Sequence, residues 1–276
     1  MDIPDISKPA TLLIEKVANS IGVLYEPTRI VKKAKAEAIA HKILKLSEIE
    51  IDEIDQRSIS RLLIEERYKQ VNIENVIKQA LPLLMPNANP EKISNDWLIN
   101  FFDKVKTISD EYLQNIWSSL LANQANYPGL YSKKTISIVS EMDKKNAIDF
   151  QNLCKFVFNV NDENIVLIYN HEDEIYKKND IKFYELTIFE TLGLVKFDVL
   201  DYLITGLDVT TNLIYGNKKY SLLSVKQKKS ISTGKVLFTP YGKELAGLCK
   251  GNYNQEIFNY FEHVFQKEGF EIISRE

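Results

Sequence analysis

Apolar side chains in the first part of the chain recur at every third or fourth position. Two stripes with a spacing of four residues consist of Trp97, Phe101, Val105, Leu113, Trp117 and Leu121. This spacing places each stripe along one face of a helix. Ser109-Asp110-Glu111, between the stripes, supplies a capping residue and negative charge suited to a helix N-terminus. Besides these two helices, the pattern predicts helices over about 9–24, 28–46, 56–84, 133–142 and 144–158.

The pattern changes after residue 160. IVLIY at 165–169 is a short β-branched and aromatic run of the kind found in strands. Alternation then dominates from Lys196 to Phe238, with a turn signal at Gly216-Asn217. Helices are expected at about 181–192 and 254–270, and the second of them carries Phe258, Phe261 and Phe265 on one stripe. The predicted fold is therefore mainly α with a C-terminal α+β part, in two domains, 1–160 and 161–276.

Residues 236–249, VLFTPYGKELAGLC, predict a strand followed by a helix. A threonine at the N-cap accepts from an otherwise unbonded backbone N–H, and proline at the next position has no N–H to lose. With the preceding LGLV (192–195), the order of helix, corner, hairpin and closing helix resembles a MarR-like winged helix over 181–249. The resemblance implies that 161–276 is a winged-helix-like domain with an extended β-hairpin wing. The insert between Val195 and Val236 is long enough to hold an extra strand pair.

The lysine content of this wing suggests contact with nucleic acid. No acidic residue occurs from Val209 to Lys243, and the candidate phosphate-binding residues within this range are Lys218, Lys219, Lys226, Lys228, Lys229 and Lys235. The helix expected at 181–192 offers only Lys182 for base edges and carries two glutamates. Any binding is therefore expected to be independent of base sequence.

Three stretches of the helical half resemble a bacterial family described only as a domain of unknown function. They are GVLYEPTRIVKKAKAEA (22–38), ERYKQVNIENVIKQA (66–80) and the segment from NDWLINFF to YSKKTI (95–136). DEYLQNIWSSLLANQ, EMDKKNAIDF and the later LGLV and LFTPYGKEL resemble, more loosely, the Abi-alpha proteins, which are linked to abortive infection. The first resemblance implies no catalytic residues. The second implies a setting, defence against phage, rather than a mechanism.

Composition is that of a folded, soluble protein. The 276 residues are 45% hydrophobic and carry a formal net charge of −3, so no general attraction to polyanions is expected. The start lacks the pattern of a signal peptide, and no run of eighteen uncharged apolar residues occurs. Cys154 and Cys249 form neither a disulfide framework nor a zinc motif. We expect inert, buried thiols and a cytoplasmic location.

Residues suited to catalysis are few. The sequence contains no G-x-x-x-x-G-K-[ST] loop and no G-x-S-x-G motif. HEDE at 171–174 has the oxygens to hold a hard cation, although a solvated acidic loop is the simpler interpretation. His41 and His263 lack a second ligand nearby in the sequence, and His263 is expected to be half-buried among aromatic neighbours. We predict no enzyme activity, no cofactor, no metal and no small-molecule site.

Three hypotheses for function remain. The leading one is a cytoplasmic, non-enzymatic interaction protein, a phage-defence component that binds a protein partner or self-associates. The second is a nucleic-acid-binding accessory protein that uses the lysine-rich wing. The third is a membrane-surface effector in which the helix over 28–46, with six basic residues against Glu37, lies on anionic lipid. The acidic run SEIEIDEID that follows instead favours neutralisation within a helix hairpin.

Overall fold

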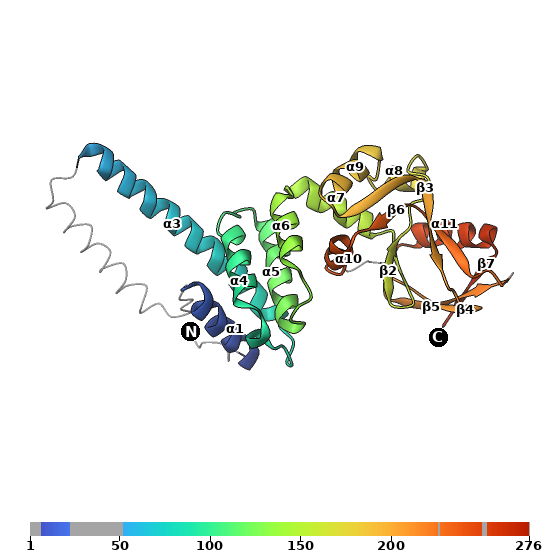
Figure 1. Cartoon of the computed structure of the whole chain (residues 1–276), viewed down its shortest axis with the longest axis horizontal. Helices are drawn as coiled ribbons and strands as arrows, with labels where there is room; N and C mark the ends of the chain where they lie inside the picture. Colours follow the sequence, from blue (N-terminus) through green and yellow to red (C-terminus); the bar gives the residue numbers. More distant parts are fainter. Residues whose placement is uncertain (1–6, 23–51, 226, 250–252, 276) are drawn as a thin grey trace. The chain divides into compact units, whose positions relative to one another are not determined.

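The computed structural model describes residues 7–22, 52–225, 227–249 and 253–275. It divides into two compact units, Met1–Lys133 and Lys134–Glu276. Helices make up the first unit, and helices and antiparallel strands are mixed in the second (Figure 1). The chain is thus a mixed α/β protein whose helices are mostly N-terminal, as the sequence predicts at this coarse level. The domain boundary expected at 160/161 lies beyond this division, and that domain assignment stays a prediction.

The described part of the first unit consists of helices. Its elements are α1 (Lys8–Ile21), α3 (Glu53–Ala80), η1 (Leu81–Leu83), η2 (Pro90–Lys92), α4 (Asn95–Val105) and α5 (Glu111–Asn126). Helix α1 packs on α4, and α3 packs on both α4 and α5. Pro82 lies in the 3-10 turn η1 directly after α3, so the helix expected over 56–84 ends at Ala80. The helix expected over 28–46 lies outside the described residues.

The two predicted apolar stripes form the core of this unit. The Phe101 ring lies 4.9 Å from that of Trp97 and 5.2 Å from that of Trp117, and all three are buried. The indole N–H of Trp97 donates to the carbonyl of Tyr131 at 2.9 Å, so this buried polar group is satisfied. Asp110 begins α5 as predicted, because its carboxylate accepts from the Leu113 N–H at 3.1 Å.

The second unit combines six described helices with two sheets. The helices are α6 (Lys133–Glu141), α7 (Lys144–Cys154), α8 (Glu174–Lys177), α9 (Phe183–Thr191), α10 (Pro240–Ala246) and α11 (Gln255–Glu268). The strands are β1 (Val157–Val160), β2 (Glu163–Val166), β3 (Val195–Thr205), β4 (Thr210–Tyr215), β5 (Lys218–Ser224), β6 (Ser230–Phe238) and β7 (Phe270–Ser274). They form one sheet in the order β2-β1-β4-β5-β7 and a second sheet of β3 and β6, with antiparallel pairing throughout.

Helix α11 packs on the five-stranded sheet through its phenylalanines. Phe261 lies 5.0 Å from Phe158 of β1, and Phe258 lies 4.6 Å from Tyr220 of β5, measured between ring centroids. Phe265 is also buried, so the stripe predicted for this helix is confirmed. Burial of each ring contributes about 1.5–3 kcal/mol, which makes this face a major source of stability for the sheet.

The sequence did not reveal two of the strands. Strand β1 follows the end of α7 at Cys154, inside a range expected to be helical up to residue 158. Asn161 and Asp162 form the turn between β1 and β2 with positive φ values of 48° and 67°, as a type I′ hairpin requires. Strand β7 follows Gly269, which has φ of 88° and ends α11.

The strand pair expected within the long insert is present. Strands β4 and β5 pair in register from Thr210 opposite Leu223 to Tyr215 opposite Lys218. The Gly216-Asn217 turn joins them, as its sequence predicts. This hairpin carries the chain from β3 into the five-stranded sheet and back to β6, so β3 and β6 are neighbours in space but not in sequence.

The start of α10 is fixed by Thr239 and Gly242. The Thr239 hydroxyl accepts from the Gly242 N–H at 3.1 Å and donates to the Gly193 carbonyl at 2.6 Å, so the predicted N-cap is confirmed. A Cβ added to Gly242 would overlap the carbonyl oxygen of Leu194. Glycine therefore permits a backbone-to-backbone approach between α10 and the corner that precedes β3.

The Gly242→Ala variant tests this close approach. We expect a loss of about 1–3 kcal/mol in the free energy of unfolding, because the methyl group forces the corner and the helix apart. The matched control is Gly247→Ala at the other end of α10, where φ is −61° and the backbone is helical. Its effect should stay within about 1 kcal/mol. Thermal unfolding followed by far-UV circular dichroism measures both, and equal midpoints for the two variants would contradict the proposed clash.

Candidate protein-contact surface

Strand β3 has more residues than β6 can pair. Phe197 pairs with Val236 and Tyr202 pairs with Gly234. Residues 198–201 therefore lie opposite Lys235 alone, and we call these four residues the β3 bulge. Unpaired residues in a bulge are displaced from the ladder, and they redirect their side chains.

Two aliphatic side chains of the β3 bulge face solvent. Val199 is 82% exposed and Leu200 is 76% exposed, the two largest values among the large hydrophobic residues that the structure describes. Single exposed apolar residues are common on protein surfaces, whereas contiguous exposed apolar patches mark contact sites more often. Whether Val199 and Leu200 form a contact site therefore depends on how firmly the backbone of the bulge is held.

Two aspartates order the β3 bulge. The Asp198 carboxylate accepts from the backbone N–H of Val199 at 2.6 Å and from that of Leu200 at 3.3 Å. The Asp201 carboxylate accepts from the Ser232 hydroxyl on β6 at 2.8 Å. Hydrogen bonds to charged acceptors are stronger than neutral ones. The apolar apex is thus held outward by polar contacts at both of its ends.

Helix α9 places exposed aromatic residues beside β3. The Phe183 ring lies 5.6 Å from that of Phe197, and Phe183 and Tyr184 are 57% and 63% exposed. Glu190 near the end of α9 accepts from the Phe197 N–H at 3.0 Å. Helix α9 lies in the range 181–192, where the winged-helix resemblance implies a recognition helix and where the sequence predicts no base readout. Its described surface presents aromatic and acidic groups next to the strand that carries the β3 bulge.

His171 completes the aromatic cluster. Its ring centroid lies 5.8 Å from those of both Phe183 and Phe197, and its Nε2 lies 3.2 Å from an oxygen of Glu172. The hydrogen bond from Lys177 lowers the pKa of Glu172. Glu172, one of the three carboxylates of HEDE, is thus paired with His171 and Lys177. Helix α8 begins within this motif at Glu174. In the part of the chain that the structure describes, no group of three or more metal-ligating side chains gathers.

A second carboxylate lies at the base of the β3 bulge. Glu268 of α11 accepts from the Ser232 N–H at 3.3 Å. Burial raises the pKa of Glu268, and the charge of Asp201 adds to this, against the hydrogen bond from Ser232 and the nearby charge of Lys228. Burial, followed by the charges of Glu268, Tyr260 and Asp201, also raises the pKa of the Tyr169 phenol. The base of the bulge is therefore acidic.

A shallow groove lies beside the same strand pair. It has a volume of about 220 Å³, and its walls come from β2, β3 and β6 together with Lys243. Lys243 pairs with Glu163 at 3.2 Å, and both residues line the groove. Leu203, at its margin, is 62% exposed, so the apolar surface of β3 continues past the bulge to this groove.

Five of the six candidate lysines are described, and they lie in or just before strands of two different sheets. Lys218 and Lys219 begin β5, and the Lys218 ammonium lies 3.7 Å from the ring centroid of Tyr253. Lys235 lies within β6, and Lys228 and Lys229 precede that strand. Lys226 lies outside the described residues. Their role in binding nucleic acid stays a prediction.

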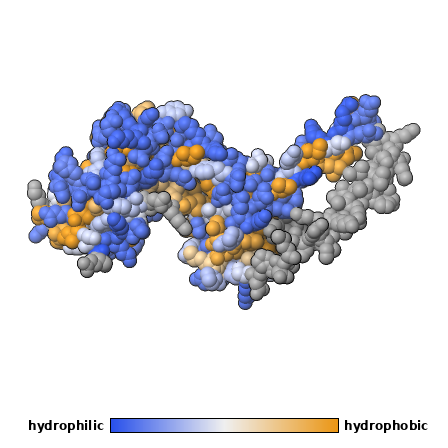
Figure 2. All heavy atoms as spheres, turned by 180° about the vertical axis from the view of Figure 1, so that it is seen from behind, coloured by the Kyte–Doolittle hydropathy of each residue, from blue (hydrophilic) through white to orange (hydrophobic). Residues whose placement is uncertain are grey.

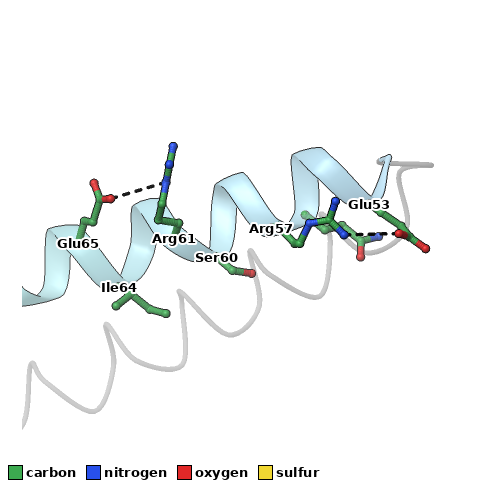
Figure 3. Close-up of a pocket in the computed structure, with 7 residues that line it drawn as sticks. Glu53, Arg57, Ser60, Arg61, Ile64 and Glu65 are labelled. Carbon is green, nitrogen blue, oxygen red and sulfur yellow. Dashed lines mark hydrogen bonds and ion pairs between the residues drawn. The ribbon is translucent and has the colours of Figure 1, made fainter.

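The middle of α3 carries a second exposed apolar surface. Ile64, Tyr68 and Val71 recur at positions i, i+4 and i+7, and each is exposed. Hydrophobic residues interrupt the hydrophilic surface of this helix (Figure 2). Figure 3 shows Ile64 pointing away from the Arg61–Glu65 ion pair, whose atoms lie 3.6 Å apart. Such exposed pairs contribute only about 0.3–0.5 kcal/mol each, so the apolar stripe is the feature that suits protein contact.

Three other expectations from the sequence have the following outcomes. His263 is exposed, so the prediction of a half-buried packing histidine is wrong, because this position faces away from the phenylalanine stripe of α11. His41 and the basic helix of the membrane hypothesis lie outside the described residues. In the described ranges, no helix has both the length and the apolar content to cross a bilayer.

Comparison with known proteins identifies one family. The sequence profile of a family described as a protein of unknown function (DUF2806) matches residues 56–262, which are 207 of the 276 residues. Neither the curated proteins nor the solved structures gave a match. A resemblance to a domain of unknown function is thus confirmed. The resemblances to Abi-alpha proteins and to a MarR-like winged helix stay predictions.

The raised pKa of Glu268 predicts a specific pH dependence of stability. Because its folded-state pKa lies above the unfolded value, ionisation disfavours the folded state, and this carboxyl lowers stability as the pH rises from below the unfolded value through the folded one. In Glu268→Gln the side chain stays neutral and can still accept from Ser232. The melting temperature of this variant minus that of the wild type should therefore rise as the pH increases from about 4, near the usual value for glutamate, through the folded-state pKa. Glu271→Gln, an exposed control on β7, should show no such trend, and a difference that falls with pH for Glu268→Gln would contradict this prediction.

Proposed function

The chain belongs to the DUF2806 family, whose function is unknown, and we propose that it is a non-enzymatic interaction protein that acts in defence against phage. The observation that carries the proposal is the β3 bulge, because Val199 and Leu200 are held outward by the hydrogen bonds of their aspartate neighbours. An ordered, exposed aliphatic pair has little conformational entropy left to lose on binding. This arrangement suits an anchor for another protein.

The charges around the bulge define the partner's chemistry. Glu190, Asp198 and Asp201 surround the apolar apex with carboxylates. A complementary surface has an apolar pocket for the two aliphatic side chains and lysine or arginine residues at its margin. Apolar anchors at the centre of an interface supply most of the binding energy. Complementary charges at the margin mainly raise the association rate and the specificity.

The setting of this interaction is proposed from the sequence. DEYLQNIWSSLLANQ and LFTPYGKEL resemble segments of the Abi-alpha proteins, which are linked to abortive infection. The first segment forms α5, whose Trp117 and Leu121 are buried, so these shared positions support the helical core and do not mark a site. The partner would then be a protein that phage infection produces or alters.

A double variant, Val199→Ser with Leu200→Ser, tests the anchor. We expect recovery of the partner from phage-infected cells to fall at least about tenfold, which corresponds to about 1.4 kcal/mol of binding energy. Quantitative mass spectrometry of proteins captured by the tagged full-length chain measures this loss, and the efficiency of phage plating on the same cells measures protection. Both capture and protection should fall together.

The matched control for the anchor is Val209→Ser with Ile273→Ser, two exposed aliphatic residues away from the bulge, at 57% and 48% exposure. Both double variants should keep the wild-type melting temperature, because exposed positions contribute little to folding. Equal capture and equal plating for the two double variants would rule out the β3 bulge as the contact site.

Binding of nucleic acid without base readout is the second proposal. It is favoured by the lack of acidic residues from Val209 to Lys243 and by the five described candidate lysines in that range. Lysine contacts to phosphates release counterions, and this makes binding weaken as salt rises. Asp198 and Asp201 on the neighbouring strand oppose it, because they repel a polyanion.

Gel-shift titrations over a salt series separate the two proposals. Lys228→Ala with Lys229→Ala should weaken DNA binding if these lysines touch phosphates. The slope of the logarithm of the binding constant against the logarithm of the salt concentration should then become shallower by about one to two. The control is Lys177→Ala with Lys178→Ala, a lysine pair at the end of α8. An unchanged slope for the first variant, or no binding of duplex or single strands by wild type, would remove the nucleic-acid proposal.

A further inference from the structure

The five-stranded sheet has one face against α11 and a second face that is polar. Phe158 and Tyr220 contact phenylalanines of α11, at 5.0 Å and 4.6 Å between ring centroids. Successive side chains of a strand point to opposite faces. The neighbouring residues Asn159 and Lys219 therefore belong to the other face of the sheet, which we call the outer face.

Strand pairing aligns polar side chains across the outer face. Direct pairing between neighbouring strands places four residues in one row, Asn164, Asn159, Ile214 and Lys219. Arg275, directly after β7, extends this row, because its backbone N–H donates to the Lys219 carbonyl at 3.1 Å. The row thus passes from two amides on β2 and β1 to two cations beside each other on β5 and at the end of β7.

A hollow of about 170 Å³ lies over this row. The side chains that supply its polar groups are Asn159, Asn212, Lys219, Arg275 and, on the turn between β1 and β2, Asp162. The Arg275 Nε–H donates to the Ser221 hydroxyl on β5. This hydrogen bond keeps the guanidinium group on the outer face, next to Lys219.

The cationic half of the hollow suits a phosphate group. Lys219 and Arg275 are exposed, and no described carboxylate lies within ion-pair distance of either side chain. Like charges beside each other on a sheet destabilise it, and an anion bound to both relieves this repulsion. Arginine carries five N–H donors, of which Ser221 takes one. The others form a planar fork that matches phosphate oxygens.

The other half of the hollow suits hydroxyl groups. Asp162 and Asn212 are exposed there, and the Asp162 N–H donates to the Asn159 side-chain oxygen at 3.1 Å, which holds the turn. An aspartate carboxylate repels a phosphate but accepts hydrogen bonds from the hydroxyl groups of a ribose. A ligand that carries a phosphate and a hydroxylated ring satisfies both halves.

We propose that this hollow binds a phosphorylated pentose, the unit found in free nucleotides and at the ends of nucleic-acid strands. Lys219 and Arg275 bind the phosphate, and Asp162 and Asn212 bind the sugar hydroxyls. Pockets for drug-sized ligands have volumes of about 300–1,000 Å³, so the smaller volume of this hollow limits the ligand to one sugar and its phosphate.

This proposal departs from the sequence analysis, which predicts no small-molecule site. The residues of the hollow come from separate strands, and only the register of the sheet brings them together. The inference does not depend on the proposed function, because the β3 bulge belongs to the other sheet.

NMR titration of the isotope-labelled full-length chain with ribose 5-phosphate tests the site. We expect shifts of backbone amide signals around the hollow and a dissociation constant of about 1 mM, as ordinary ligand efficiency gives for a molecule of this size. Lys219→Gln and Arg275→Gln should each weaken binding at least about tenfold, because each removes a charged contact. The matched control is Lys218→Gln, the adjacent lysine whose ammonium lies over the Tyr253 ring. It should keep the wild-type affinity.

A second variant tests the sugar half of the hollow. Asp162→Gly removes the carboxylate and preserves the turn, because φ is 67° at this position and Asn-Gly suits a type I′ hairpin. Wild type should bind ribose 5-phosphate more tightly than inorganic phosphate. In Asp162→Gly this preference should be lost, while inorganic phosphate binds at least as tightly as it does to wild type.

Two further ligands distinguish the sources of the pentose phosphate. A mononucleotide represents the free source, and a short single strand with a terminal phosphate represents the nucleic-acid source. The tighter of the two identifies the source. The proposal is overturned by the absence of shifts up to about 10 mM ribose 5-phosphate, by equal weakening in Lys218→Gln and Lys219→Gln, or by equal wild-type affinity for ribose 5-phosphate and inorganic phosphate. Melting temperatures confirm that each variant is folded, as expected for exposed positions.

Discussion

Two glycines set the position of β6, and the rest of the second unit depends on them. A Cβ on Gly234 would overlap the Ile168 carbonyl oxygen, and one on Gly242 would overlap that of Leu194. At the first site, the Lys235 N–H donates to the Ile168 carbonyl at 2.7 Å. Backbones approach this closely only where no side chain intervenes. Strand β6 is thereby fixed at one point to the segment after β2 and at the other to the corner before β3.

The β3 bulge is a consequence of these two fixed points. The corner sets the pairing of Val195 with Phe238, and the Ile168 contact sets the position of Gly234, which pairs with Tyr202. Between these pairs, β3 has more residues than β6. The excess cannot stay in the ladder, so it leaves the sheet with Val199 and Leu200 at its apex. The exposed anchor therefore follows from register, and its exposure is built into the fold.

Features that depend on residues close together in the sequence, such as helix caps and turns, were predicted. The Thr239 N-cap, the Asp110 N-cap, the Gly216-Asn217 turn and the phenylalanine stripe of α11 each lie where the residues indicate. Strand β1 was missed because its four residues continue the apolar run of α7, although Asn161-Asp162 is a recognisable two-residue turn. Helix α11 ends at Glu268 with Gly269 as its cap, slightly before the predicted end at 270, and β7 beyond it is stabilised by pairing with β5.

Features that depend on distant contacts could not be predicted. The β3 bulge requires the register of β3 against β6, and that register is set by the contacts of Gly234 with Ile168 and of Gly242 with Leu194, each of which joins segments far apart in the sequence. The lysines show the converse, because the described members of one basic stretch of sequence lie partly on β5 and partly in or just before β6, and these strands belong to different sheets. The aspartates and aliphatic residues of the β3 bulge do share a surface, because hydrogen bonds within the bulge and to Ser232 hold them together.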